Sequence, residues 1–121
     1  MVLVDISVWV AHFRDGNPQL EVLLMKGGIA CHPFIIGELA CGNLKNKKEI
    51  LSLLQALPLA TTADQEEVLR FVERHHFMGI GLGYIDVHLL ASAKLSGIPF
   101  WTKDKKSAEA AKKLSVSYKK S

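Results

Sequence analysis

Short apolar runs alternate with helix-like segments along the whole chain, and this alternation limits the possible folds most strongly. The apolar runs are the length of buried strands and lie at residues 2–5, 29–32, 58–60, 98–102 and 116–118. Segments with apolar residues at helical spacing lie between them, at residues 7–14, 18–26, 34–41, 47–57, 62–74, 84–96 and 105–114. Because parallel strands need helical crossovers, the pattern predicts an α/β domain with a four- or five-stranded, mostly parallel sheet and helices on both faces.

The length and composition of the chain suit one domain. It has 121 residues, and its 49% hydrophobic content supports a core without disulfides. We therefore expect a single domain over residues 1–121. No apolar stretch reaches the ~20 residues of a membrane-spanning helix. Residues 2–10 contain Asp5 and follow no basic segment, unlike a signal peptide. We expect a cytoplasmic protein without membrane contacts.

The cysteines do not form a recognised metal or redox motif. Cys31 and Cys41 are ten positions apart, and we expect both thiols to be free and buried. A zinc site that adds His32, His75 and His76 is disfavoured, because these residues lie on separate predicted elements without a recognised spacing.

Positive charge is concentrated in the last third of the chain. Residues 1–74 hold seven basic and nine acidic side chains, whereas residues 75–121 hold eight basic and three acidic ones. This skew permits a polyanionic partner such as nucleic acid. From charge alone, a solvated lysine face that aids solubility is the favoured explanation.

Four acids occupy positions where an α/β sheet would form a site. Asp5 directly follows the first predicted strand, and Asp104 follows the 98–102 run. The carboxyl ends of parallel strands are the usual place for such sites. Glu38 lies among apolar residues on the helix after the second strand, and Asp86 lies in the first turn of the 84–96 helix.

Each acid except Asp5 also has a structural explanation. Asp86 suits a helix N-terminus, Asp104 suits a helix cap, and Glu38 suits an ion pair with a lysine. A carboxylate at the end of a buried strand, as at Asp5, is costly unless it is paired or metal-bound. Physical reasoning alone therefore selects Asp5 first.

Together the four carboxylates indicate a divalent cation. Gathered in one cleft they would repel one another, and a cation would relieve that repulsion. Oxygen-only ligands match Mg²⁺ or Mn²⁺, which can activate water and shield a phosphodiester. The hydroxyls of Ser7 and Thr102 lie near the two strand ends, where they can orient such waters.

Four acid-containing motifs follow one another along the chain, at residues 3–9 (LVDISVW), 36–42 (IGELACG), 84–93 (YIDVHLLASA) and 100–105 (FWTKDK). In sequence and order they resemble the motifs of PIN-domain nucleases, in particular the VapC-type toxins of bacterial type II toxin–antitoxin systems. The resemblance implies a PIN fold, Mg²⁺- or Mn²⁺-dependent endoribonuclease activity, a homodimer and neutralisation by a VapB-type antitoxin. It also implies that Asp5, Glu38, Asp86 and Asp104 are catalytic and metal-binding, with Ser7 as an accessory catalytic hydroxyl and Thr102 as a second candidate.

The chain departs from the family pattern at two places. Ile6 stands where many relatives have Thr, a change of small consequence. Lys105 and Lys106 stand where many relatives carry a further acid. A second metal site is therefore in doubt, and we hypothesise that these lysines contact RNA phosphates instead.

Two other functions were weighed against a nuclease. A receiver-like phosphoacceptor domain needs two adjacent acids after its first strand, whereas Val4 precedes Asp5. A PIN-fold module that binds RNA or a partner without cutting it is the main alternative, and the presence of all four acids argues against it. Trp9 and Trp101 lie inside apolar runs, where a core role is expected; RNA stacking would need them exposed.

Overall fold

The structure is a computed structural model that describes residues 1–119. Within this range, strands β1 (Val2–Val4), β2 (Ile29–Ala30) and β3 (Phe100–Trp101) form one parallel sheet in the order β2-β1-β3. Leu3 in β1 is in register with Ala30 of β2 and with Phe100 of β3. The first strand of the chain is thus the central one, and its carboxyl end lies in the middle of the sheet edge.

The sheet of the described residues has three strands, fewer than the four or five expected. Residues 58–60 and 116–118 each add a single parallel bridge, from Leu59 to Cys31 and from Ser117 to Phe100. Both segments lie at the outer edges of the sheet. Pro58 has no N–H to donate, which helps to limit pairing at that edge. The parallel α/β arrangement is confirmed.

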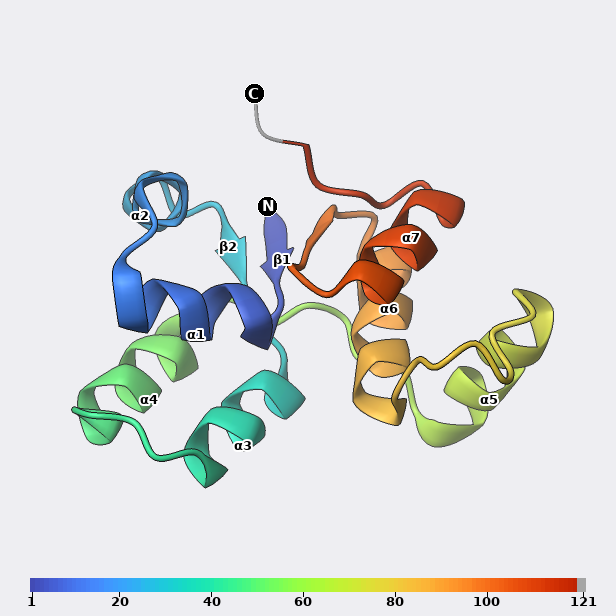
Figure 1. Cartoon of the computed structure of the whole chain (residues 1–121), viewed down its shortest axis with the longest axis horizontal. Helices are drawn as coiled ribbons and strands as arrows, with labels where there is room; N and C mark the ends of the chain where they lie inside the picture. The colour runs from blue at the N-terminus through green and yellow to red at the C-terminus, as the bar shows by residue number, and fades with distance from the viewer. Residues whose placement is uncertain (120–121) are drawn as a thin grey trace.

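The helices form two groups with the strands between them (Figure 1). The helices are α1 (Ile6–Asp15), α2 (Pro18–Met25), α3 (Pro33–Cys41), α4 (Lys47–Ala56), α5 (Gln65–Arg74), α6 (Tyr84–Ser96) and α7 (Lys105–Lys113). Helix α3 packs against α1 and α4, while α6 packs against α5, α7 and β3. The predicted placement of helices on both faces of the sheet is confirmed.

Local capping explains where several helices begin. Pro18 and Pro33 occupy the first turns of α2 and α3, where proline's missing N–H is tolerated. The backbone N–H of Phe34 donates to Nδ1 of His32, which caps α3. Asp64 and Glu67 form a reciprocal capping box, so α5 starts later than the expected position 62.

The core is centred on β1 and α6. The side chains of β1 are buried, and α6 is buried continuously from Val87 to Ala93. Trp9 and Trp101 are both buried, which confirms their core role. Cys31 is free and buried as expected, but Cys41 is exposed because it lies at the outer end of α3. Across residues 1–119, no helix has both the length and the apolar character needed to cross a membrane.

Candidate metal centre

Asp5 is held at the carboxyl end of β1 by two hydroxyl groups. The residue is only 3% exposed, and its Oδ2 accepts hydrogen bonds from Ser7 Oγ at 2.7 Å and from Thr102 Oγ1 at 2.8 Å. Each hydroxyl is itself fixed by a backbone N–H, Ser7 by that of Lys103 and Thr102 by that of Asp104. These bonds join the end of β1 to the segment after β3 and fix the orientation of the Asp5 carboxylate.

The second carboxylate oxygen of Asp5 is buried without a partner. No donor among the described residues reaches Oδ1. An unsatisfied buried carboxylate oxygen costs free energy on folding, and a cation would offset that cost. The arrangement therefore fits a divalent cation at Oδ1, with Oδ2 committed to the two hydroxyls.

Asp86 lies in the first turn of α6 and shares an electrostatic field with Asp5 and Asp104. Its Oδ2 accepts from the backbone N–H of Gly83 at 3.1 Å. The pKa of Asp86 is raised chiefly by burial; the Gly83 hydrogen bond lowers it, and the carboxylates of Asp5 and Asp104 raise it further. Asp86 therefore has both a helix-terminal role and an electrostatic link to the other two acids.

Asp104 is exposed and caps α7. Its Oδ2 accepts from the backbone N–H of Ser107 at 2.9 Å. Its own N–H bonds to Thr102, the residue that holds Asp5. The structural explanation of Asp104 as a helix cap is thus confirmed, although the same residue also adds negative charge near Asp86.

Glu38 is an exposed residue of α3. It forms no ion pair within residues 1–119, so the alternative of a lysine partner finds no support there. Helical spacing places Glu38 on the same face of α3 as Phe34. The Phe34 ring lies 4.6 Å from the His88 ring of α6, so this face is directed toward α6.

The four acids do not form a closed ligand cage. Among the described residues, no group of three or more His, Cys, Asp or Glu side chains is arranged to hold a metal ion. The structure links Asp5, Asp86 and Asp104 electrostatically. A ligand set of all four acids remains a prediction.

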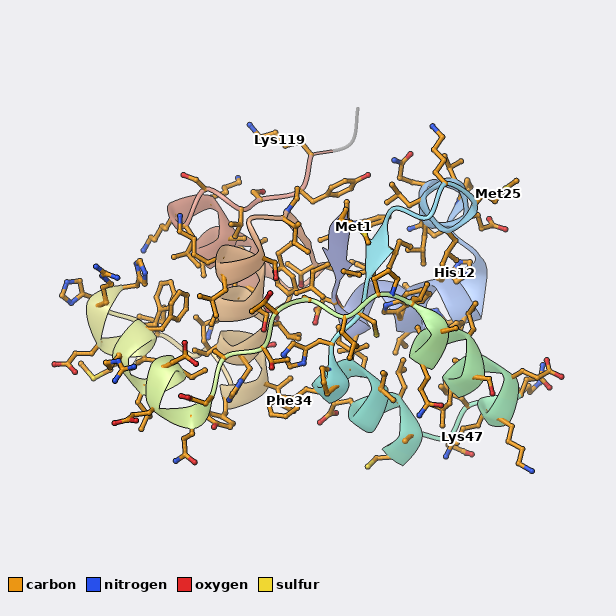
Figure 2. The ribbon with its side chains drawn as sticks, turned by 180° about the vertical axis from the view of Figure 1, so that it is seen from behind. Met1, His12, Met25, Phe34, Lys47 and Lys119 are labelled. Carbon is orange, nitrogen blue, oxygen red and sulfur yellow. The ribbon has the colours of Figure 1, made fainter. Side chains whose placement is uncertain are left out.

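A cluster of aromatic rings between α3 and α6 was not recognised from the sequence. His88 is buried, and its ring packs edge to face with those of Phe34 and Tyr84. The i, i+4 spacing of Tyr84 and His88 indicates a shared helix face. The contact with Phe34 depends on how α3 and α6 meet. Figure 2 shows Phe34 at the end of α3 that faces α6.

One cavity of the described residues lies apart from the predicted site acids. It has a volume of about 770 Å³ and lies between α5 and the later turns of α6, with Phe71, Arg74 and Lys94 in its lining. None of the predicted site acids belongs to that lining in the described part of the chain.

Comparison with known proteins identifies the family. Residues 2–113 match the PIN domain model. Two curated proteins named Ribonuclease VapC32, from Mycobacterium tuberculosis strains CDC 1551 and H37Rv, are each 42% identical over 107 residues. Those alignments cover 88% of this chain and 86% of each relative. The chain therefore belongs to the PIN-domain family and is similar within it to VapC-type ribonucleases.

Proposed function

We propose that this protein is a Mg²⁺- or Mn²⁺-dependent endoribonuclease and the toxin of a type II toxin–antitoxin module. The observation that carries the proposal is the buried, unpartnered Oδ1 of Asp5 in a field shared with Asp86 and Asp104. Oxygen donors alone favour Mg²⁺ or Mn²⁺ over zinc. The family membership and the similarity to named ribonucleases support the assignment of RNA as substrate.

The residues of the site have distinct roles in this proposal. Asp5, Glu38, Asp86 and Asp104 would hold the cation directly or through water, with Ser7 and Thr102 fixing the Asp5 carboxylate. A bound divalent cation supplies an activated water and shields the charge that develops on the phosphodiester. Asp104 and Glu38 are both exposed, so a cation held by them would be open to a bound strand.

Cleavage of total RNA tests the proposal. The purified protein should cut RNA at defined positions with Mg²⁺ or Mn²⁺ and not with EDTA, as sequencing of the RNA ends would show. Asp5→Asn and Asp86→Asn should each reduce cleavage by at least ~100-fold without unfolding the protein. Asp64→Asn is the matched control, because it removes an exposed carboxylate at the cap of α5 while an Asn can still cap the helix.

Two results would contradict the assignment. Near-normal turnover by Asp86→Asn with Mg²⁺ would remove that residue from the site. Equal cleavage with and without EDTA would exclude a metal-dependent reaction.

The alternative is a catalytically weak PIN-fold module that binds RNA or a partner. It is favoured by the absence, in residues 1–119, of three potential ligands already arranged around one point. Binding of RNA by the wild-type protein, without metal-dependent cutting of any RNA in the pool, would support this alternative over the nuclease.

The proposal includes the protein's partners and setting. We infer a homodimer of single PIN domains that acts in the cytoplasm and is neutralised by a VapB-type antitoxin. The product of a small neighbouring gene with a DNA-binding start should co-purify with the protein and suppress cleavage. Analytical ultracentrifugation of the protein alone would measure the oligomeric state; a monomer would contradict the inferred dimer.

A further inference from the structure

An exposed aromatic side chain lies beside the acidic site. Tyr84 begins α6 two positions before Asp86, and the residue is 52% exposed. No other Phe, Trp or Tyr in residues 1–119 is exposed to a comparable degree, and both tryptophans are buried. Large aromatic side chains at a wet surface are characteristic of binding sites.

The Tyr84 ring is supported on one side by a buried histidine. It packs against His88 with ring centroids 4.5 Å apart at 81°. His88 is only 4% exposed and also packs against Phe34 of α3, at 4.6 Å. The ring is therefore supported by a buried cluster that joins α3 to α6, while about half of the residue stays open to solvent.

Tyr84 and Asp86 both belong to the first turn of α6. Side chains two positions apart do not share a helix face. The Asp86 carboxylate, however, turns back to the N-terminus of the helix, where its Oδ2 accepts from the N–H of Gly83, the residue directly before Tyr84. A strand whose phosphate lay at this helix terminus would place a neighbouring base near the Tyr84 ring.

Charge explains why RNA needs an uncharged contact here. The acids of the site repel a polyanion before a cation neutralises them, so a contact that does not depend on charge adds affinity beside them. Stacking of a base on an aromatic ring does not depend on charge and is worth about 1–3 kcal/mol per base. Lys106, whose side chain lies over Gly81 in the segment before α6, is a cation available to the same strand.

We propose that Tyr84 is the base-stacking residue of the site and receives an unpaired base next to the phosphodiester to be cut. Stacked recognition of splayed bases requires single-stranded RNA, because bases within a duplex already stack on their neighbours. This inference rests on the proposed ribonuclease function. It adds a specificity-determining residue to that function.

Fluorescence of 2-aminopurine tests the stacking separately from cleavage. The probe is a mixed-sequence single-stranded RNA oligonucleotide carrying 2-aminopurine at alternate positions. It is titrated with Asp5→Asn protein in Mg²⁺, a background that removes cleavage and one negative charge. Binding should quench the fluorescence. Adding Tyr84→Ala should abolish the quenching and weaken binding about ten-fold or more, whereas adding Tyr84→Phe should preserve both.

Steady-state cleavage with otherwise unmutated protein gives the second readout. Tyr84→Ala should raise KM about ten-fold on a single-stranded RNA that contains a mapped cleavage site. The same sequence annealed into a duplex should be cut poorly by all variants. Leu95→Ala is the matched control, because Leu95 lies on the same helix and is also 52% exposed.

The outcomes separate the stacking inference from the proposed function. Unchanged KM and quenching in Tyr84→Ala, or equal losses in Tyr84→Ala and Tyr84→Phe, would overturn the stacking role. A Tyr84→Ala variant that changes oligomeric state by size exclusion would reassign the ring to a subunit contact and also overturn it. Quenching that depends on Tyr84 in a protein that never cuts RNA would support stacking while refuting the nuclease.

Discussion

The two oxygens of the Asp5 carboxylate have different environments. Oδ2 accepts from Ser7 and Thr102, whereas Oδ1 is buried with no partner in the described part of the chain. The two hydroxyls lie 3.4 Å apart and receive backbone N–H bonds, so their own hydrogens are directed at Asp5. In this arrangement the protein itself satisfies one oxygen and leaves the other for an added ligand.

Removal of either hydroxyl should weaken the response to metal. Ser7→Ala and Thr102→Val should each raise the Mg²⁺ concentration needed for half-maximal cleavage by about 10-fold, because residues that orient metal ligands typically contribute 10–100-fold. Titration of the cleavage rate with Mg²⁺ measures this. Thr102→Ser, which keeps the hydroxyl, should behave like the wild type. A lower maximal rate with no change in Mg²⁺ dependence would count against an orienting role.

Asp86 should destabilise the metal-free protein. Its raised pKa means that the fold disfavours the ionised carboxylate, so the destabilisation appears as pH rises above the ordinary Asp value of 3.8. Asp86→Asn should therefore raise Tm at pH 7 in EDTA, and the difference from wild type should shrink as pH falls. Thermal melts at several pH values measure this. A lower Tm for the variant at pH 7 would contradict the sign.

At the scale of elements, α7 begins with residues that have both structural and chemical roles. Asp104 caps the helix, and Lys106 extends over Gly81 toward the start of α6. Gly81 has φ of +85°, and a Cβ there would collide with the lysine side chain. The start of α7 is therefore packed against the segment that precedes Asp86.

Two substitutions of Asp104 separate capping from charge. Asp104→Ala should lower the free energy of unfolding by about 1 kcal/mol through loss of the cap. Asp104→Asn keeps a good capping residue and should leave stability nearly unchanged while still reducing cleavage. Denaturant melts and cleavage rates together measure both effects. Full activity in Asp104→Asn would limit this residue to capping.

The lysines at the start of α7 should contribute to the salt dependence of RNA binding. Lys105→Ala combined with Lys106→Ala should weaken binding and reduce the slope of log K against log salt by about 1.4, since each phosphate contact to a single strand contributes roughly 0.7. Lys112→Ala combined with Lys113→Ala removes the same charge from the other end of α7 and should leave the slope closer to wild type. An unchanged slope in the first variant would refute the phosphate contact.

At the scale of the whole molecule, a buried histidine pair lies where the two helix groups meet. His32 caps α3 through Nδ1, and its ring lies 6.5 Å from that of His88 on α6. Burial, with a smaller effect of His88, lowers the pKa of His32 to about 4. A protonated His32 could not accept the Phe34 N–H bond, so acid would remove a helix cap at this junction.

As the pH falls, the unfolded chain binds a proton at His32 before the folded protein does, so the free energy of unfolding should decrease. The contribution of His32 is fully present above the ordinary pKa of 6.5 and is lost as pH falls toward 4, by up to about 3 kcal/mol. His32→Asn retains a capping acceptor without titrating and should reduce this pH dependence. Denaturant melts between pH 4 and 7 measure it. His76→Asn, at an exposed position with positive φ, is the control and should keep the wild-type profile.

The sequence by itself determined the class of fold and the first acid of the site. Alternating apolar runs and helical spacings are local patterns. Proline and capping residues also act within one helical turn. The positions of the helices could therefore be predicted from neighbouring residues alone. The α5 start was misplaced only because Thr62 and Asp64 both suit a cap. Asp5 was identified because a carboxylate after a buried strand has no inexpensive structural role.

The tertiary structure decided which distant groups meet. Thr102 bonds to Asp5 across 97 positions, and the contact exists because β3 pairs beside β1. The contact between the Phe34 and His88 rings likewise depends on how α3 and α6 pack. The two expected edge strands form only one bridge each. Strand pairing depends on residues that are distant in the sequence, and a local sequence pattern does not reveal them. Local spacing fixes the direction of a side chain on its own element, whereas packing between elements fixes what it faces.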